Sequence, residues 1–95
     1  MQLMQQAGLP YLVTASGNVI VGKGVIVGFF CTTSSSGTAA IYDDASTGTT
    51  LKIVDTVSLT AGTFYPLSIL VTQGVNIVVG GTLKGTLVFA PAMGI

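Results

Sequence analysis

The sequence predicts an all-β protein, namely an antiparallel β-sandwich of seven or eight short strands, with the jelly roll as the variant expected at eight. Turn signals built from Gly, Ser, Asn and Pro recur at the spacing of about 8–12 residues that is typical of sandwiches. Between these signals the chain is rich in Val, Ile, Thr and Phe, which favour pleated strands. Apolar residues alternate with a period of two, and no helical period appears after residue 10.

Residues 1–10 (MQLMQQAGLP) are unlike the rest of the chain, because they are rich in Gln and Met and contain no β-branched residue. A segment this short is not stable as a helix by itself. We therefore expect an N-terminal arm over residues 1–10 that contacts a partner, followed by one β-sandwich domain over residues 11–95. Leu3, Met4 and Leu9 are the arm residues that we expect to make this contact.

The first half of the domain predicts four strands, over residues 11–15, 18–21, 24–33 and 38–42. In the third of these, odd-numbered and even-numbered residues should face opposite ways, yet both sets are mostly apolar. Because an antiparallel sheet normally turns a polar face to water, another molecule should cover the outer face of this strand. We expect Ile26 and Phe30 to lie on that face and to pack between copies. The Ser-rich segment 34–37 is predicted to be a turn.

The second half predicts strands over residues 51–59, 63–71, 75–79 and 82–90, the first either continuous or kinked near Asp55. Pro66 has no N–H to donate to a neighbouring strand, so its own strand should lie at a sheet edge or carry a bulge. Gly80 and Gly81 are typical of a two-residue hairpin turn.

Charge is scarce. Three Lys balance three Asp, there is no Arg, Glu or His, and charged residues make up 6% of the chain, against about 25% in an ordinary soluble domain. A solitary monomer needs a charged surface, so we expect sister copies or a larger assembly to cover much of this one. Nucleic acid is not an expected partner, since phosphate binding needs clustered Lys or Arg. A membrane is not expected either, because the longest apolar run, residues 24–31, is far shorter than the roughly 20 residues of a spanning helix.

Nothing in the sequence predicts an enzyme. A nucleophilic Cys31 would need a neighbouring base such as His, which the chain lacks, so we expect Cys31 in the core. Asp43 and Asp44 lack the ligand spacing of a calcium loop, and we expect them to accept hydrogen bonds from their own backbone. We therefore predict no catalytic residue, no cofactor and no metal.

The run GTAAIYDDASTGTTL, followed by LTAGTFYPLSILVTQGVNIVVGGTLKGTLVF, resembles small virion proteins of tailed bacteriophages. In those chains a strand that ends in Tyr-Asp, an AG-x-x-YP turn and strand, and a late GGT recur in this order. The resemblance covers about residues 17–89. It implies a capsid decoration (cement) protein, which is a β-sandwich without cofactor or active site, often trimeric, seated on the outside of a shell.

The partners that this resemblance implies are the major capsid protein and further copies of the chain. Its place would be the capsid surface of the virion, after synthesis in the host cytoplasm. The scarcity of charge departs from the family pattern and leaves another virion position open, such as a head–tail connector or fibre-base protein. A small β module that binds a ligand or a host surface is a third reading, and it would need an exposed aromatic platform.

Overall fold

The computed structural model describes residues 8–91, which form six strands and no helix. The strands are β1 (Leu9–Val13), β2 (Gly17–Val21), β3 (Gly24–Tyr42), β4 (Lys52–Ser58), β5 (Thr63–Val71) and β6 (Gly74–Pro91). All pairings between them are antiparallel and belong to one sheet. The prediction of an all-β, antiparallel protein is therefore confirmed.

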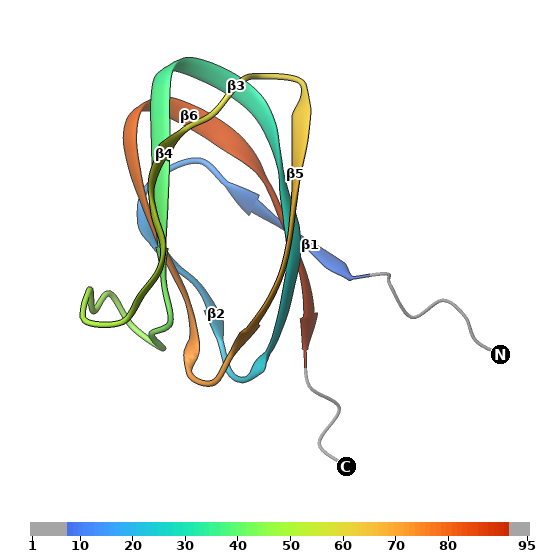
Figure 1. Ribbon diagram of the computed structural model, residues 1–95, viewed down its shortest axis with the longest axis vertical. Helices are drawn as coiled ribbons and strands as arrows, with labels where there is room; N and C mark the ends of the chain where they lie inside the picture. The colour runs from blue at the N-terminus through green and yellow to red at the C-terminus, as the bar shows by residue number, and fades with distance from the viewer. Residues whose placement is uncertain (1–7, 92–95) are drawn as a thin grey trace, which may run out of the picture.

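β3 and β6 are the central strands, with 19 and 18 residues. They pair with each other almost from end to end, and both arch over the top of the molecule in Figure 1. The arch lies where the register shifts between Ser35 and Thr38, and where Ser36 and Gly81 have positive φ values of 52° and 64°. A side chain at Gly81 would collide with the backbone oxygen of Ser36, so glycine is required there.

The arch corrects the predicted strand count. The turns expected at residues 34–37 and at Gly80-Gly81 lie opposite each other inside the two long strands. Because the two irregularities coincide, both strands bend together and the ladder of hydrogen bonds continues through the bend. Six strands therefore replace the seven or eight predicted.

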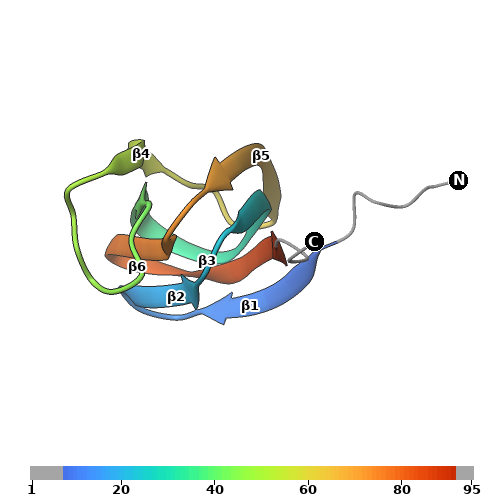
Figure 2. The same cartoon turned by 90° about the horizontal axis from the view of Figure 1, so that it is seen from below.

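The bend divides the sheet into two halves of four strand segments each. In the β5 half, the order is β1, the end of β6, the start of β3, and β5. In the β4 half, the order is β2, the start of β6, the end of β3, and β4. Figures 1 and 2 show the two halves facing each other, with β4 and β5 on one side of the molecule and β1 and β2 on the opposite side.

The core fills the space between the two halves. Its buried residues come from both, and include Val13, Ile20, Ile26, Phe29, Cys31, Ile41, Val71, Val75, Ile77, Leu83, Leu87 and Phe89. Tyr11 packs edge-on against Phe89, with ring centroids 6.4 Å apart. Cys31 is fully buried, which confirms its predicted place in the core.

A register shift between Ile26 and Gly28 changes which residues of β3 face inward. Ile26 is fully buried, and Phe29 and Cys31 share its inner side, whereas Phe30 points outward and is 38% exposed. The prediction that Ile26 lies on the outer face is wrong, because a bulge at this point breaks the strict alternation on which it depended. Pro66 lies opposite Gly28 beside the shift, in a strand that pairs only with β3, as its missing N–H predicted.

The predicted boundary between the N-terminal arm and the β domain, at residue 10, falls inside β1. Leu9 and Pro10 belong to β1, where they pair with Phe89 and Val88 of β6. Leu9 is 51% exposed within this strand. Leu3 and Met4 lie outside the described residues.

Candidate interaction surfaces

The solvent side of the β5 half is apolar, and we call it the outer face. A row of paired residues crosses it from strand to strand, in the order Leu12, Thr86, Phe30 and Phe64. Leu12 is 77% and Phe64 44% exposed, and Leu70, farther along β5, is 62% exposed. The Phe64 ring lies across Gly28, where a side chain would collide with it. Isolated exposed apolar residues are ordinary, but a contiguous group on one face indicates an interaction site.

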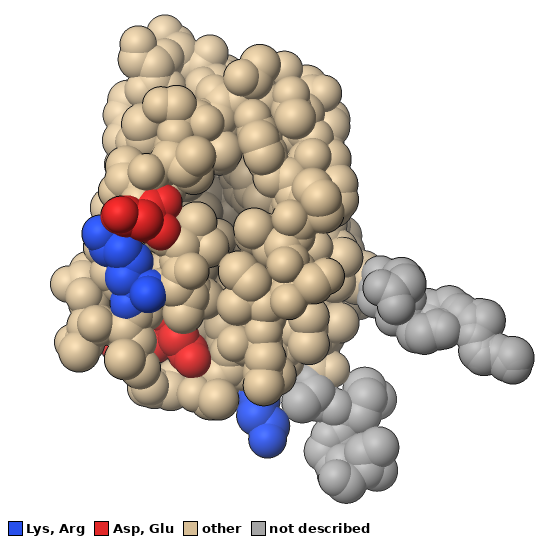
Figure 3. Space-filling view, in the orientation of Figure 1, with Lys and Arg blue, Asp and Glu red and all other residues tan. Residues whose placement is uncertain are grey.

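The outer face carries no charge. The segments that build it, residues 9–13, 24–31, 63–71 and 85–91, contain no Asp, Glu, Lys, Arg or His. In Figure 3 the charged side chains in view lie on the side of β4 and at the lower rim, and the side of β5 shows none. Among the described residues, no charged side chain therefore belongs to this face.

Part of the matching side of the β4 half is covered by the chain itself. The loop of residues 43–51, between β3 and β4, lies against it (Figure 2). Asn76 donates from Nδ2 to the Gly48 carbonyl at 3.0 Å, and Asn18 donates to the Asp44 carbonyl at 3.1 Å. Asn76 is only 2% exposed as a result. The loop thus covers the part of this half around Asn18 and Asn76, whereas Val21 and Val78 of the same half stay 74% and 37% exposed.

Asp43 fixes the start of this covering loop. Its carboxylate accepts hydrogen bonds from the N–H groups of Thr72, Gln73 and Gly74 at 3.0, 2.9 and 3.3 Å, and from the Thr72 hydroxyl at 3.1 Å. Burial, the largest single influence, raises the pKa of Asp43, but these bonds together outweigh it and hold the pKa below 3.8. Asp43 therefore joins the end of β3 to the β5–β6 turn. The prediction that Asp43 accepts hydrogen bonds from its own neighbouring backbone is wrong.

Asp44 behaves as expected, because its Oδ1 accepts the N–H of Ser46 at 2.8 Å. On β4, Lys52 and Asp55 form an exposed ion pair at 3.0 Å, and the Lys52 Nζ lies 5.6 Å from the centre of the Tyr42 ring. These charges neutralise one another at one end of β4. None of them is arranged beside a nucleophile or a second acid.

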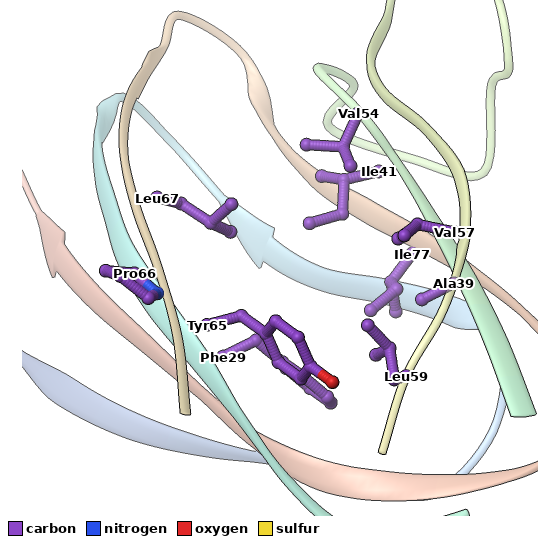
Figure 4. A pocket seen from close by; sticks show the side chains of 10 residues that line it. All are labelled: Phe29, Ala39, Ile41, Val54, Val57, Leu59, Tyr65, Pro66, Leu67 and Ile77. Carbon is purple, nitrogen blue, oxygen red and sulfur yellow. The ribbon is translucent and has the colours of Figure 1, made fainter. Parts of the chain in front are cut away.

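A second surface feature is an apolar cleft between β4 and β5, which we call the β4–β5 cleft. It has a volume of about 290 Å³ and opens toward the viewer in Figure 3. Figure 4 shows the residues that line it, which are Phe29, Ala39, Ile41, Val54, Val57, Leu59, Tyr65, Pro66, Leu67 and Ile77. The Tyr65 hydroxyl reaches across to accept the Thr60 N–H at 2.7 Å and closes one end. The cleft exists because β4 and β5 both pair with β3 and not with each other.

Of the residues chosen from the sequence, Phe30 lies on the outer face and Leu9 lies at the start of β1, on the same half. Ile26 is in the core, and so does not belong to any surface. The cleft was not predicted, nor was it predicted that the polar loop after Tyr42 covers part of the sheet. The signal that could have found the cleft is Pro66, which marked β5 as an edge strand.

Among residues 8–91 there is no group of three or more His, Cys, Asp or Glu side chains that could hold a metal ion. The same part of the chain has no helix with the length and apolar character needed to cross a membrane. Comparison with known proteins finds no family model, no curated protein and no solved structure that matches this chain.

Proposed function

We propose that this chain is a virion structural protein, specifically a capsid decoration (cement) protein that bridges capsomers through its outer face. The observation that carries the proposal is the difference between the two halves of the sheet. The loop of residues 43–51 covers part of the β4 half, whereas the row from Leu12 to Phe64 is exposed on an uncharged face that no described loop covers. Contact with another polypeptide would remove this apolar surface from water, and contiguous faces of this kind are often interaction sites. The partners in this proposal are the major capsid protein and sister copies, with a trimer as the favoured arrangement.

The size of the outer face supports a role on a repeating shell. Four strand segments about 4.8 Å apart and on average about seven residues long give a face of only about 450 Å². A standard stable interface buries about 800 Å² on each partner. One such face is therefore too small to hold a free dimer, but identical contacts repeated by the symmetry of a shell add together.

We assign the bent sheet to the β-sandwich class, in its jelly-roll variant. If β3 and β6 are each counted as two segments on either side of the arch, the chain has eight strand segments in two facing groups of four. Eight strands in two sheets describe a jelly roll, an architecture used by viral capsid domains. This assignment supports a place in the virion, on its capsid surface, after synthesis in the host cytoplasm.

The test is binding to shells assembled from the major capsid protein, measured by co-sedimentation. We expect Leu12→Asp and Phe64→Asp to lower the affinity at least about tenfold, because each places a charge in an apolar contact. Val21→Asp is the matched control, since Val21 is 74% exposed but lies on β2, outside the outer face. Equal binding by all three variants would contradict the proposal.

Cryo-electron microscopy of the whole particle separates this role from its closest rival. Density on the capsomers supports a decoration protein, and density at the tail vertex supports a connector or fibre-base protein. Binding of a soluble ligand to Phe30 and Phe64, without any affinity for shells, would instead support a small ligand-binding module.

A further inference from the structure

We infer that the β4–β5 cleft receives residues 1–7 of a second copy of the chain, with Met4 inserted into it and Leu3, which points the other way in an extended segment, at its rim. This inference rests on the proposed function, because it names the segment and the site through which copies join. It concerns a different surface from the outer face, so the two can be tested apart.

The cleft is suited to apolar side chains of a peptide. Its volume of about 290 Å³ lies just below the roughly 300–1,000 Å³ of ligand pockets. Sites for small molecules usually add a few convergent polar groups that fix the ligand. Here the lining is apolar apart from the Tyr65 hydroxyl, which already accepts the Thr60 N–H at 2.7 Å. One or two inserted side chains fit this description better than a cofactor does.

The strands beside the cleft can also bind the backbone of a peptide. In the described chain, β4 and β5 each pair with a strand on one side only, so a row of N–H and C=O groups is free on the other. An extended peptide can add to such an edge. β4 is the better edge, since β5 contains Pro66 and a positive-φ residue, Ser68 (59°). The Lys52–Asp55 ion pair lies in the first part of β4, and residues 56–58 at the end of this strand are uncharged.

Residues 1–7 (MQLMQQA) match this site in chemistry. Their side chains carry no charge, so no side-chain ion has to leave water, and they offer two apolar side chains in succession, Leu3 and Met4. Seven extended residues reach up to about 25 Å.

The place of β1 favours exchange between copies. β1 lies on the side of the molecule opposite β4 and β5 (Figure 2), and its first residue is at the rim in Figure 1. The segment before it is therefore better placed for the cleft of a neighbour than for its own. Because the segment and the cleft are different surfaces, the contact runs head to tail and can close into a ring. A ring of three copies would account for a trimer.

Cysteine cross-linking of full-length chains tests the inference. A Leu3→Cys variant is mixed with a Val57→Cys variant under mild oxidation, and the disulfide-linked dimer is quantified by non-reducing electrophoresis. Val57 is 44% exposed at the cleft, whereas the native Cys31 is fully buried and does not compete. Val21→Cys is the matched control, because Val21 is exposed on β2. We expect the Val57→Cys pairing to give at least about tenfold more mixed dimer than the control pairing.

Adding Met4→Asp to the Leu3→Cys chain should lower that yield at least about tenfold, because the change removes a buried apolar side chain. Equal yields from the Val57→Cys and Val21→Cys pairings would overturn the inference. The inference would also be overturned if a chain that carries both Leu3→Cys and Val57→Cys forms only an intramolecular disulfide. If cross-linking fails while shells are still bound, only this inference falls. If cross-linking succeeds while shells are not bound, only the proposed function falls.

Discussion

The two halves of the sheet each contain four strand segments, but they differ in how far a loop of the chain covers their solvent side. The β4 half is partly covered by the loop of residues 43–51, held by Asp43, Asn18 and Asn76, although Val21 and Val78 stay exposed. Within residues 8–91 no loop covers the β5 half, and its outer face exposes Leu12, Phe30 and Phe64. Polar side chains on the first half therefore act in folding, whereas apolar side chains on the second are free to act in assembly. Each of the following predictions tests this division.

The largest effect is expected at Asp43. Asp43→Ala removes the acceptor for four hydrogen bonds at the base of the loop. We expect the free energy of unfolding to fall by about 3 kcal/mol, because the donors of the β5–β6 turn are left without a charged partner. Urea denaturation measures this loss. Asp44→Ala is the control, with an expected loss below about 1 kcal/mol, and equal losses would show that Asp43 does not hold the loop.

Acid should weaken the same attachment by a smaller amount, since a protonated carboxyl still accepts some of these bonds. The pKa of Asp43 is lower in the folded chain than its ordinary value of 3.8. Its contribution to stability is therefore complete above pH 3.8 and is lost as the pH falls through the folded pKa. Thermal melting between pH 5 and pH 2 checks this, at roughly the range over which such carboxylates titrate. Asp43→Asn should flatten the dependence, and an unchanged acid profile would contradict it.

A moderate effect is expected at Asn76. Asn76→Ala removes the bond to the Gly48 carbonyl and loosens the far end of the loop. We expect a loss of about 1 kcal/mol in the free energy of unfolding, together with faster amide exchange in residues 43–51. Val78→Ala is a control on the same strand, because Val78 is 37% exposed and does not hold the loop. Unchanged exchange would mean that the loop is held by other contacts.

The smallest effect on stability is expected on the outer face. Leu12→Ser should change the free energy of unfolding by no more than about 0.5 kcal/mol, because Leu12 is 77% exposed. The same change should reduce self-association at high concentration, as measured by light scattering. A loss as large as that of Asn76→Ala would indicate that Leu12 supports the fold, and the contrast between the halves would then fail.

Much of the fold could be predicted from the sequence. Strand composition, period-two alternation and Pro66 correctly identified the antiparallel sheet, its edge at β5 and the burial of Cys31. These features are local, or depend on one residue. The arch was not predictable in the same way, because the Ser-rich segment and Gly80-Gly81 have the composition of ordinary turns. Only their position opposite each other keeps both strands continuous.

The surfaces were harder to predict for the same reason. Ile26 was misplaced because a bulge is set by pairing with β5 and β6, which lie far away in the sequence. The role of Asp43 depends on donors 29 to 31 residues away. The β4–β5 cleft depends on two strands that fail to meet. Each of these is a long-range relation that leaves no pattern within any one segment.

The central place of β6 has a consequence for biosynthesis. This strand is the partner of β1, β2 and β3, and it is the last strand of the described chain to leave the ribosome. The β4 half therefore cannot acquire its native order until the start of β6 has been made, and the β5 half cannot until translation has reached the end of β6 at Pro91. Folding must then bring together segments separated by most of the chain, which makes it slow compared with that of helical proteins. Until it is complete, the nascent polypeptide presents several unpaired apolar strands, and shielding by a chaperone would matter most in that interval.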